Sequence, residues 1–362
     1  MPAQNKDALM SNKPQCVGID FGTFKTSIVA SNGNRDSIMT AVGLPKDHIA
    51  RGMLGCDEVF GDRIGQVRTA VNLVRPFDCG ALKYTDSSAA GLSADEVNRR
   101  CKAAKSIMGE VVRRVELGTG PRYAVIGAPS QASDEAKNVI LQAASPHFDA
   151  VMIVAEPFCI AYGFGHLVGT LVVDIGAGTI DVCPMFGTYP KPDQQYSASV
   201  GGDAVDRELL SLIQQAHPEA QVTLNMARQF KEKFGTVSDD QERAMVVMPV
   251  EGVPTEFDIT DIIRDACRVL VEPIIEGIHK TVAMSDPEFQ AQLRGNILLG
   301  GGGSQLRGLD RLLETGVEKL GGGKVTRVND CLYAGAAGAL KLCMAMPAEN
   351  WEQLRSQNAK AA

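Results

Sequence analysis

The sequence predicts an α/β fold built from two similar halves. Short apolar runs that end at glycine alternate with helical patterns along the whole chain, which favours mainly parallel sheets with helices between the strands. One unit, a strand followed by a glycine turn and a second strand, occurs twice, as CVGIDFGTFKTSIVA at 16–30 and LVVDIGAGTIDVC at 171–183. Asp20 and Asp174 close the first strand of each unit, 154 residues apart. The repeat predicts an internal duplication, although two unrelated hairpins could share the pattern by chance.

Composition limits the classes of protein to consider. A length of 362 residues corresponds to about two domains. The net charge of −7 disfavours general nucleic-acid binding, and no uninterrupted apolar window of about 18 residues indicates a membrane span. The nine cysteines form no CxxC pair, so we expect free thiols in a reducing compartment and no zinc site. The N-terminus lacks the apolar stretch of a signal peptide, so the expected location is the cytoplasm.

Four elements are expected between the two repeated units. A helical pattern covers 95–117, a buried strand covers 123–129, and a second helix covers 133–144. Ser133 is placed to cap that second helix. A strand at 151–157 ends in a turn or at the start of a helix.

The second half continues the same alternation. Three amphipathic helices are expected first, then a strand that enters a glycine loop, a helix, a short strand and a last helix rich in small residues. In chain order these elements cover 203–216, 222–234, 258–280, 296–304, 305–320, 325–328 and 332–344.

The two repeated turns carry the clearest chemistry. A tight glycine turn at a strand end presents successive backbone N–H groups, which bind phosphate oxygens without a full positive charge. Gly22 would permit close approach in the first turn, and Gly176 and Gly178 in the second. Asp20 and Asp174 stand beside these turns, and Mg²⁺ prefers one or two carboxylates while it keeps several waters. Together the turns predict a site for Mg²⁺ and a polyphosphate, whereas either turn alone would indicate no more than a hairpin.

Two groups of charged residues are weaker candidates. Glu156 could orient or deprotonate a water molecule at a terminal phosphate, or could serve as a helix cap or a surface charge. Lys231 and Glu232 could flank a ribose and a base. The alternative is a solvated helix face on which Arg228 pairs with Glu232.

The glycine loop of 296–304 is a further nucleotide signal. A strand that enters four glycines and then a helix is typical of a nucleotide contact. The chain lacks a P-loop sequence, and GAGTID fails the GxGxxG dinucleotide pattern because Asp181 fills the last position.

Taken in order, five segments resemble the motifs of the actin–Hsp70–sugar-kinase ATPase superfamily. They resemble its first phosphate hairpin, first connecting helix, second phosphate hairpin, adenosine motif and second connecting helix, and they read IDFGT (19–23), AEPFCIAYG (155–163), VVDIGAGTID (172–181), NILLGGGGS (296–304) and YAGAAGAL (333–340). Two further segments are similar to bacterial actins, RPFDCG (75–80) and GGDAVD (201–206). Four resemble the magnetosome-associated bacterial actins: TAVGLPKDHIARGMLG (40–55), VIGAPSQASDEAK (125–137), VVDIGAGTID (172–181) again, and GGGSQLRGL (301–309).

The resemblance implies an actin-like ATPase fold with two ribonuclease-H-like halves, a nucleotide cleft between them and a smaller subdomain in each half. Four subdomains are implied: IA at 13–42, 75–168 and 330–350, IB at 43–74, IIA at 169–200 and 257–329, and IIB at 201–256.

The resemblance also implies roles for individual residues. Asp20 and Asp174 would organise Mg²⁺, and Asp174 would thereby act in catalysis together with Glu156, the catalytic carboxylate, and Thr179, which helps to place the water. Phe24 and Ile180 stand where relatives usually carry a small residue and a second threonine, which bears on the rate of hydrolysis. The residues implied to contact ATP or ADP are Asp20, Gly22, Thr23, Phe24, Lys25, Gly176, Ala177, Gly178, Gly202, Asp203, Arg228, Lys231, Glu232, Gly301, Gly302, Gly303 and Ser304.

We therefore expect a cytoplasmic actin-like ATPase that polymerises with ATP into filaments that organise and position magnetosomes. The expected partners are further copies of the chain and magnetosome adaptor proteins. Neither direct nucleic-acid binding nor membrane insertion is expected, because the N-terminal segment MPAQNKDALMSNKPQ holds few apolar side chains. The alternatives are a plasmid- or organelle-segregating bacterial actin, a small-molecule kinase of the same superfamily, and a non-hydrolysing ATP-binding scaffold. An Hsp70-like chaperone is disfavoured, because no peptide-binding domain follows the last motif.

Overall fold

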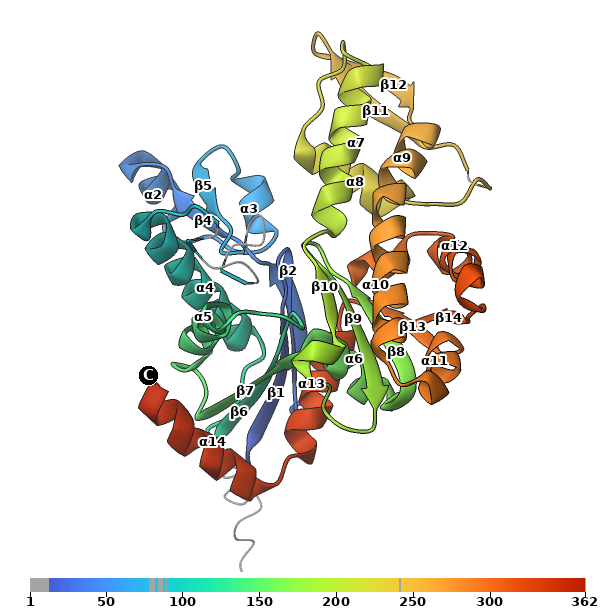
Figure 1. Ribbon diagram of the computed structural model, residues 1–362. Helices are drawn as coiled ribbons and strands as arrows, with labels where there is room; N and C mark the ends of the chain where they lie inside the picture. Colours follow the sequence, from blue (N-terminus) through green and yellow to red (C-terminus); the bar gives the residue numbers. More distant parts are fainter. Residues whose placement is uncertain (1–12, 78–81, 84–86, 89, 241, 362) are drawn as a thin grey trace, which may run out of the picture. The chain divides into compact units, whose positions relative to one another are not determined.

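The computed structural model (Figure 1) describes residues 13–361 except 78–81, 84–86, 89 and 241. The expectation about membrane insertion by the N-terminus and part of the RPFDCG motif therefore lie outside the described residues. Within the described part of the chain, no helix is both long and apolar enough to cross a membrane. The chain divides into two compact units, 1–166 together with 332–362, and 167–331.

The first unit is built on a five-stranded sheet in the order β3-β2-β1-β6-β7. The central strand β1 pairs antiparallel with β2 and parallel with β6, and β2–β3 and β6–β7 continue these two directions. Parallel pairing is therefore confined to the β6 and β7 side of β1, and the sheet is mixed rather than mainly parallel; the β1–β2 pair is the predicted hairpin, which a tight turn can join only in the antiparallel direction. The strands are β1 Gln15–Phe21, β2 Lys25–Ala30, β3 Arg35–Met39, β6 Arg122–Ala128 and β7 Ala150–Ala155.

Helices cover both faces of this sheet (Figure 1). Along β1 the alternate residues Val17, Ile19 and Phe21 are fully buried in a cluster with apolar side chains of α4 and α5. Cys16 lies in a separate cluster with residues of α13 and α14 on the opposite face. The helices of this unit are α2 His48–Leu54, α3 Arg63–Gln66, α4 Ala94–Arg114, α5 Asp134–Ala144, α6 Glu156–Phe164, α13 Ala334–Ala345 and α14 Ala348–Ala361.

A smaller part of the first unit has its own core. The hairpin of β4 (Val42–Pro45) and β5 (Val71–Val74) carries α2 and α3 between its strands. Its core consists of Ala41, Leu54, Val59, Ile64 and Val71. These short elements were not predicted from the sequence.

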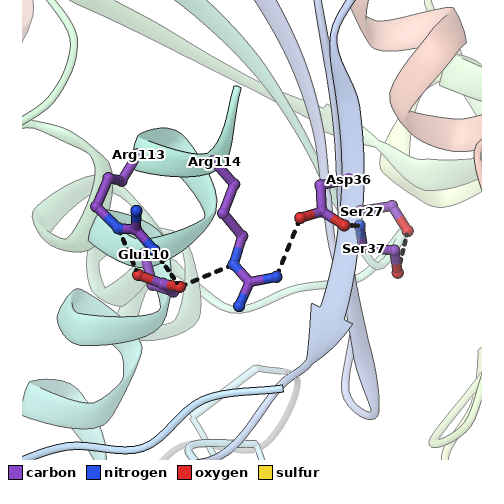
Figure 2. Close-up of polar contacts among 6 residues, drawn as sticks. All are labelled: Ser27, Asp36, Ser37, Glu110, Arg113 and Arg114. Atoms are coloured by element: carbon purple, nitrogen blue, oxygen red, sulfur yellow. Dashed lines mark hydrogen bonds and ion pairs between the residues drawn. The ribbon is translucent and has the colours of Figure 1, made fainter. Parts of the chain in front are cut away.

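A polar network joins helix α4 to the edge strand β3 (Figure 2). Glu110 accepts hydrogen bonds from Arg113 and Arg114, and Arg114 Nη1 lies 3.1 Å from Asp36 Oδ2. The other oxygen of Asp36 accepts the backbone N–H of Ser37 at 2.7 Å. Partial burial raises the pKa of Glu110, but the hydrogen bonds and charges of the two arginines outweigh burial and lower it. The network therefore fixes α4 over the sheet with charges that balance one another.

The second unit repeats the sheet of the first. Its five strands follow the order β10-β9-β8-β13-β14, with antiparallel pairs on the β9 side of β8 and parallel pairs on the β13 side. Strand order and direction match the first sheet position by position, so the predicted duplication is confirmed. The strands are β8 Val168–Ile175, β9 Ile180–Phe186, β10 Tyr196–Ala198, β13 Ile297–Gly300 and β14 Val325–Arg327, and a separate hairpin is formed by β11 Met245–Val250 and β12 Val253–Asp258.

Two expected helices of this unit are interrupted. The helix expected over 258–280 ends at Cys267, passes through a 3₁₀ turn and resumes at Val271. Pro273 has no N–H to donate to the carbonyl of Val269, so a continuous α-helix is disfavoured there. The α-helices are α7 Gly202–Ala216, α8 Leu224–Phe234, α9 Thr260–Cys267, α10 Val271–Met284, α11 Pro287–Arg294 and α12 Leu309–Gly316; 3₁₀ turns occupy Pro192–Gln194, Arg268–Leu270, Gly302–Gln305 and Glu318–Leu320.

The helix expected over 305–320 is shorter than predicted. It begins only at Leu309, because Gly308 precedes it with a φ of +79°, outside the right-handed helical region. The helix ends at Gly316, and a 3₁₀ turn follows.

The packing of α13 against α6 can be tested at Gly338. A Cβ added to Gly338 would lie 1.8 Å from the carbonyl oxygen of Cys159, whereas a Cβ on Gly52 of α2 would meet nothing within 4 Å. We expect Gly338→Ala to lower the free energy of unfolding by about 1–3 kcal/mol or more, because a backbone atom must move. Gly52→Ala, the control, should leave stability equal or slightly higher. Urea denaturation measures both, and equal midpoints for the two variants would contradict the packing.

Candidate functional site

The end of β1 places Asp20 against α13. Asp20 is the last residue but one of the strand, and a Cβ added to Gly335 of α13 would lie 3.2 Å from its Oδ2. In the sheet, Asp20 is the register partner of Gly127 on β6. Gly127 in turn leaves room for Glu156, because a Cβ there would lie 3.0 Å from Glu156 Cγ. Two carboxylates predicted from sequence thus lie around one glycine of the central sheet.

Glu156 is held by a lysine that the sequence analysis missed. Glu156 is the first residue of α6, directly after β7, and its side chain is buried. Lys83 Nζ lies 2.9 Å from Glu156 Oε1, and Lys83 is only 2% exposed. No sequence pattern marks Lys83, because 73 residues separate it from its partner.

Two neighbouring charges, Glu156 and Lys83, and burial change the pKa of Asp20. The pKa of the Asp20 carboxyl is raised from 3.8 to about 7: burial is the largest cause, the charge of Glu156 adds to the rise, and the charge of Lys83 opposes both. Ionised Asp20 is thus costly unless another cation is near. That is the electrostatic condition under which a carboxylate gains most from binding a metal ion.

The first glycine turn, Gly22 to Lys25, is tight. A Cβ on Gly22 would lie 2.3 Å from the carbonyl oxygen of Lys25, so the turn requires glycine. Thr40, which directly follows β3 and is fully buried, closes the turn: its Oγ1 donates to the carbonyl of Gly22 and its N–H to the carbonyl of Phe24, both at 2.8 Å. Thr23 is buried, Lys25 is exposed, and the half-buried Phe24 ring lies 5.1 Å from the guanidinium of Arg75.

The second unit repeats the strand end. Asp174 is the last residue but one of β8, it is buried, and its register partner on β13 is Gly300, as Gly127 is for Asp20. Gly301 has a φ of +72°, and a Cβ there would lie 2.4 Å from Asp174 Oδ1. Both sheets therefore combine a strand-end carboxylate with glycine on the neighbouring parallel strand.

The second glycine turn is fixed by the start of helix α7. The N–H of Gly176 donates to the carbonyl of Thr179 across the turn at 2.9 Å. The carbonyls of Gly176 and Ala177 accept the N–H groups of Gly202 and Asp203 at 3.0 and 2.8 Å. Gly201, the first residue of the GGDAVD segment but not one of the predicted site residues, is required because a Cβ there would lie 2.6 Å from the carbonyl oxygen of Gly176.

The start of α7 is also bound to α8. Arg228 donates to Asp203 at 2.9 Å and to Asp206 at 2.7 Å, and Lys231 Nζ lies 2.6 Å from Asp206. Lys231 also donates to the carbonyl of Gly202 at 2.8 Å. Arg228 thus pairs across to α7, so the alternative pairing with Glu232 on the same helix is wrong.

The residues predicted on the ribose side therefore do not all lie together. Arg228, Lys231 and Asp203 share one cluster beside the second turn, whereas Glu232 is exposed and lies outside it. Burial raises the pKa of Asp203, and the charge of Arg228 opposes that shift.

The glycine loop after β13 packs on the end of β8. A Cβ on Gly303 would lie 2.2 Å from Ile175 Cγ2, and Ser304 is fully buried with its Oγ donating to the carbonyl of Gly301 at 2.7 Å. At Gly302 a Cβ would meet nothing within 4 Å. Packing alone accounts for glycine at 301 and 303, and only Gly302 has open space beside it.

The donors present suit Mg²⁺. Each unit offers a strand-end carboxylate, Asp20 in the first and Asp174 in the second, and carboxylate oxygens are ligands that Mg²⁺ prefers. Among the residues that the structure describes, no group of three or more His, Cys, Asp or Glu could hold a metal by itself. Each carboxylate, taken by itself, suits an ion that keeps most of its waters.

Comparison with known proteins gives matches over nearly the whole chain. The MreB/Mbl protein family model matches residues 15–348. The actin-like protein MamK of Paramagnetospirillum magneticum is 34% identical over 339 residues, which cover 93% of this chain and 94% of MamK. The cell shape-determining protein MreB of Escherichia coli is 30% identical over 184 residues, which cover 46% of this chain and 51% of MreB.

Two solved structures of MamK are similar in fold. A chain of the MamK double helical filament has a TM-score of 0.86 and 34% identity, with 92% of this chain and all of that chain covered. A non-polymerising MamK mutant bound to AMPPNP has a TM-score of 0.69 and 33% identity, with 92% of this chain and 99% of that chain covered.

The raised pKa of Asp20 predicts a pH-dependent difference between the wild-type chain and Asp20→Asn. The folded wild type holds the Asp20 proton more tightly than the unfolded chain does. Its free energy of unfolding should therefore fall as the pH rises from about 4 to about 7, by up to about 1.4 kcal/mol per pH unit. The Asn variant lacks this loss, so it should gain stability relative to the wild type over that range, with no further gain above pH 7.

Urea denaturation without nucleotide, in EDTA, measures this difference. Asp57→Asn, which changes a carboxylate that is 77% exposed, serves as the control and should follow the wild type. Parallel stability curves for Asp20→Asn and the wild type would contradict the prediction.

Proposed function

The chain belongs to the MreB/Mbl family and has the actin-like fold, and on that premise we propose that it is an ATP-dependent filament-forming protein. We propose further that its filaments organise and position magnetosomes. The observation that carries the first proposal is the duplicated strand end, a carboxylate beside a tight glycine turn in each unit. The magnetosome assignment is supported by the 34% identity to MamK over 93% of the chain.

We propose that the two turns bind the phosphates of ATP through backbone N–H groups. Mg²⁺ would be held by Asp20 and Asp174 and would neutralise the charge of the phosphates during hydrolysis. The ribose and adenosine are assigned to the cluster of α7 and α8 and to the glycine loop after β13. The residues proposed for these contacts are Gly22–Lys25, Gly176–Gly178, Gly202, Asp203, Arg228, Lys231, Glu232 and Gly301–Ser304.

The proposed reaction is hydrolysis of ATP to ADP and phosphate. The oxygen of a water molecule attacks the γ-phosphorus, the bond from phosphorus to the β–γ bridging oxygen breaks, and its electron pair leaves with ADP. Glu156 accepts a hydrogen bond from the water and Thr179 helps to place it, while the proton that the water loses ends on the released phosphate. The buried, ion-paired position of Glu156 supports this role better than a surface charge would.

The organisation of the chain and its partners are also proposals. We retain the four subdomains with the boundaries expected from sequence. A second copy of the chain is the proposed main partner, supported by the similarity to a chain of the MamK double helical filament. Magnetosome adaptor proteins are proposed as further partners, in the cytoplasm.

Negative-stain electron microscopy and sedimentation of the purified protein test the proposed assembly. With ATP and Mg²⁺ we expect filaments and most of the protein in the pellet, and without nucleotide mainly dispersed protein. Phosphate should be released steadily as the filaments form and turn over. A protein that stays dispersed in ATP but consumes it with a small molecule would be a kinase, and filaments without phosphate release would indicate a scaffold; either result would contradict the proposal.

Glu156→Gln tests the catalytic assignment with little change of shape. The amide keeps the size of the side chain but replaces the negatively charged carboxylate, whose oxygen accepts the hydrogen bond from water. We therefore expect phosphate release to fall by about a hundredfold while ATP binding and assembly persist. Filaments of the variant should be longer-lived, because they remain in the ATP state. Normal phosphate release by Glu156→Gln would refute the role.

A further inference from the structure

The ion pair between Lys83 and Glu156 is unusual in its burial. Lys83 is 2% exposed and Glu156 8%, and the ammonium nitrogen lies 2.9 Å from Oε1. Taking both charges out of water is costly, and apolar residues of similar volume are often as stabilising as such a pair. Stability alone is therefore a weak reason for a lysine at this position.

The backbone beside Lys83 is also under constraint. Leu82 has a φ of +59°, a conformation that is rare for a bulky residue, and its side chain is fully buried in the core of the first unit. Strained backbone of this kind persists only where surrounding packing enforces it, and it is enriched at functional sites. Leu82 directly precedes Lys83, whose ammonium pairs with Glu156 at the start of α6.

A second contact restricts the Lys83 side chain. Its ammonium lies 5.9 Å from the centre of the Phe77 ring, within the range of a cation–π interaction. Phe77 in turn packs edge-on against Phe21, the last residue of β1, with ring centres 4.9 Å apart. The ammonium is therefore held on one side by the carboxylate and on the other by an aromatic pair tied to the strand that carries Asp20.

We propose that Lys83 is a positioning residue for hydrolysis: it fixes the Glu156 carboxylate through Oε1 and leaves Oε2 to accept a hydrogen bond from the attacking water. A carboxylate has lone pairs on both oxygens, so one donor from Lys83 does not exhaust it. The ammonium also offsets the repulsion between Glu156 and the negative phosphates. The inference rests on the proposed ATPase function, and it adds a residue that no motif of the sequence marks.

Lys83→Met, Lys83→Arg, Glu156→Gln and the double variant Lys83→Met/Glu156→Gln test the proposal. Phosphate release is measured with Mg·ATP and expressed per assembled protein. Lys83→Met should lower kcat by about tenfold to a hundredfold, the effect of one lost charge-assisted hydrogen bond, with KM for ATP unchanged. Lys83→Arg should recover much of the rate. In the Glu156→Gln background, Lys83→Met should add almost no further loss, because the group it positions has been removed.

Lys280→Met is the matched control. Lys280 pairs with Glu276 at 2.6 Å on the exposed surface of α10, so this variant removes an ion pair outside the site and should keep the wild-type kcat. The cycle is repeated as urea denaturation without nucleotide, where Lys83→Met and Glu156→Gln together should lower the midpoint by less than the sum of the two single losses.

The outcomes separate two failures. If the wild type releases phosphate, three results would overturn the role of Lys83 and leave the ATPase proposal standing. They are a wild-type kcat for Lys83→Met, a raised KM of that variant at constant kcat, and a loss of kcat on Lys83→Met that is as large in the Glu156→Gln background as in the wild type. Absence of release from the wild type under assembly conditions would refute the ATPase function and this role with it. Additive midpoint losses in urea would show that the two side chains do not interact, which also overturns the proposal.

Discussion

The structure depends on glycine at the point where the central strand of each sheet ends in a carboxylate. Asp20 lies next to Gly127 on the parallel strand, and Asp174 next to Gly300. A side chain at Gly127 would meet Glu156, and one at Gly301 would meet Asp174 itself. Gly127 thus leaves room for the buried Glu156 at the start of α6, and Gly301 leaves room for the buried Asp174 at the end of β8. Packing of the sheet and chemistry of the site are therefore set by the same positions.

Regular local patterns made much of the fold predictable. The two strand–turn–strand units and the helices at 94–114 and 134–144, the latter capped by Ser133, follow from periodicity and capping alone. The errors arise where one residue overrides the pattern, as Pro273 does in the helix expected over 258–280. The two hairpins were predicted, but the strands β3 and β10 that extend the antiparallel side of each sheet were missed.

The site was predictable only in part, for a different reason. Residues that lie in motifs, such as Asp20 and Glu156, could be named from sequence. Lys83 and Thr40 could not, because their partners, Glu156 and the carbonyl of Gly22, are distant from them in the chain. Arg228 shows the same limit. Its helical spacing favoured Glu232, whereas the structure gives it two carboxylates of α7. A local pattern cannot compare a partner on the same helix with one on a neighbouring helix.

The two units share the same sheet, but different groups surround the end of the central strand in each. The first unit surrounds its strand-end carboxylate with a second carboxylate and a buried lysine, whereas the second unit fixes its turn with the N–H groups that open α7. The two residues that depart from the family pattern, Phe24 and Ile180, also lie in different units and in different surroundings. Ile180 is fully buried in the core of the second unit, so its side chain cannot contact a ligand without leaving that core. Phe24 is half-buried within the first turn, where its ring meets the guanidinium of Arg75. An effect of these departures on hydrolysis would therefore act through Phe24, in the unit that also carries Glu156 and Lys83.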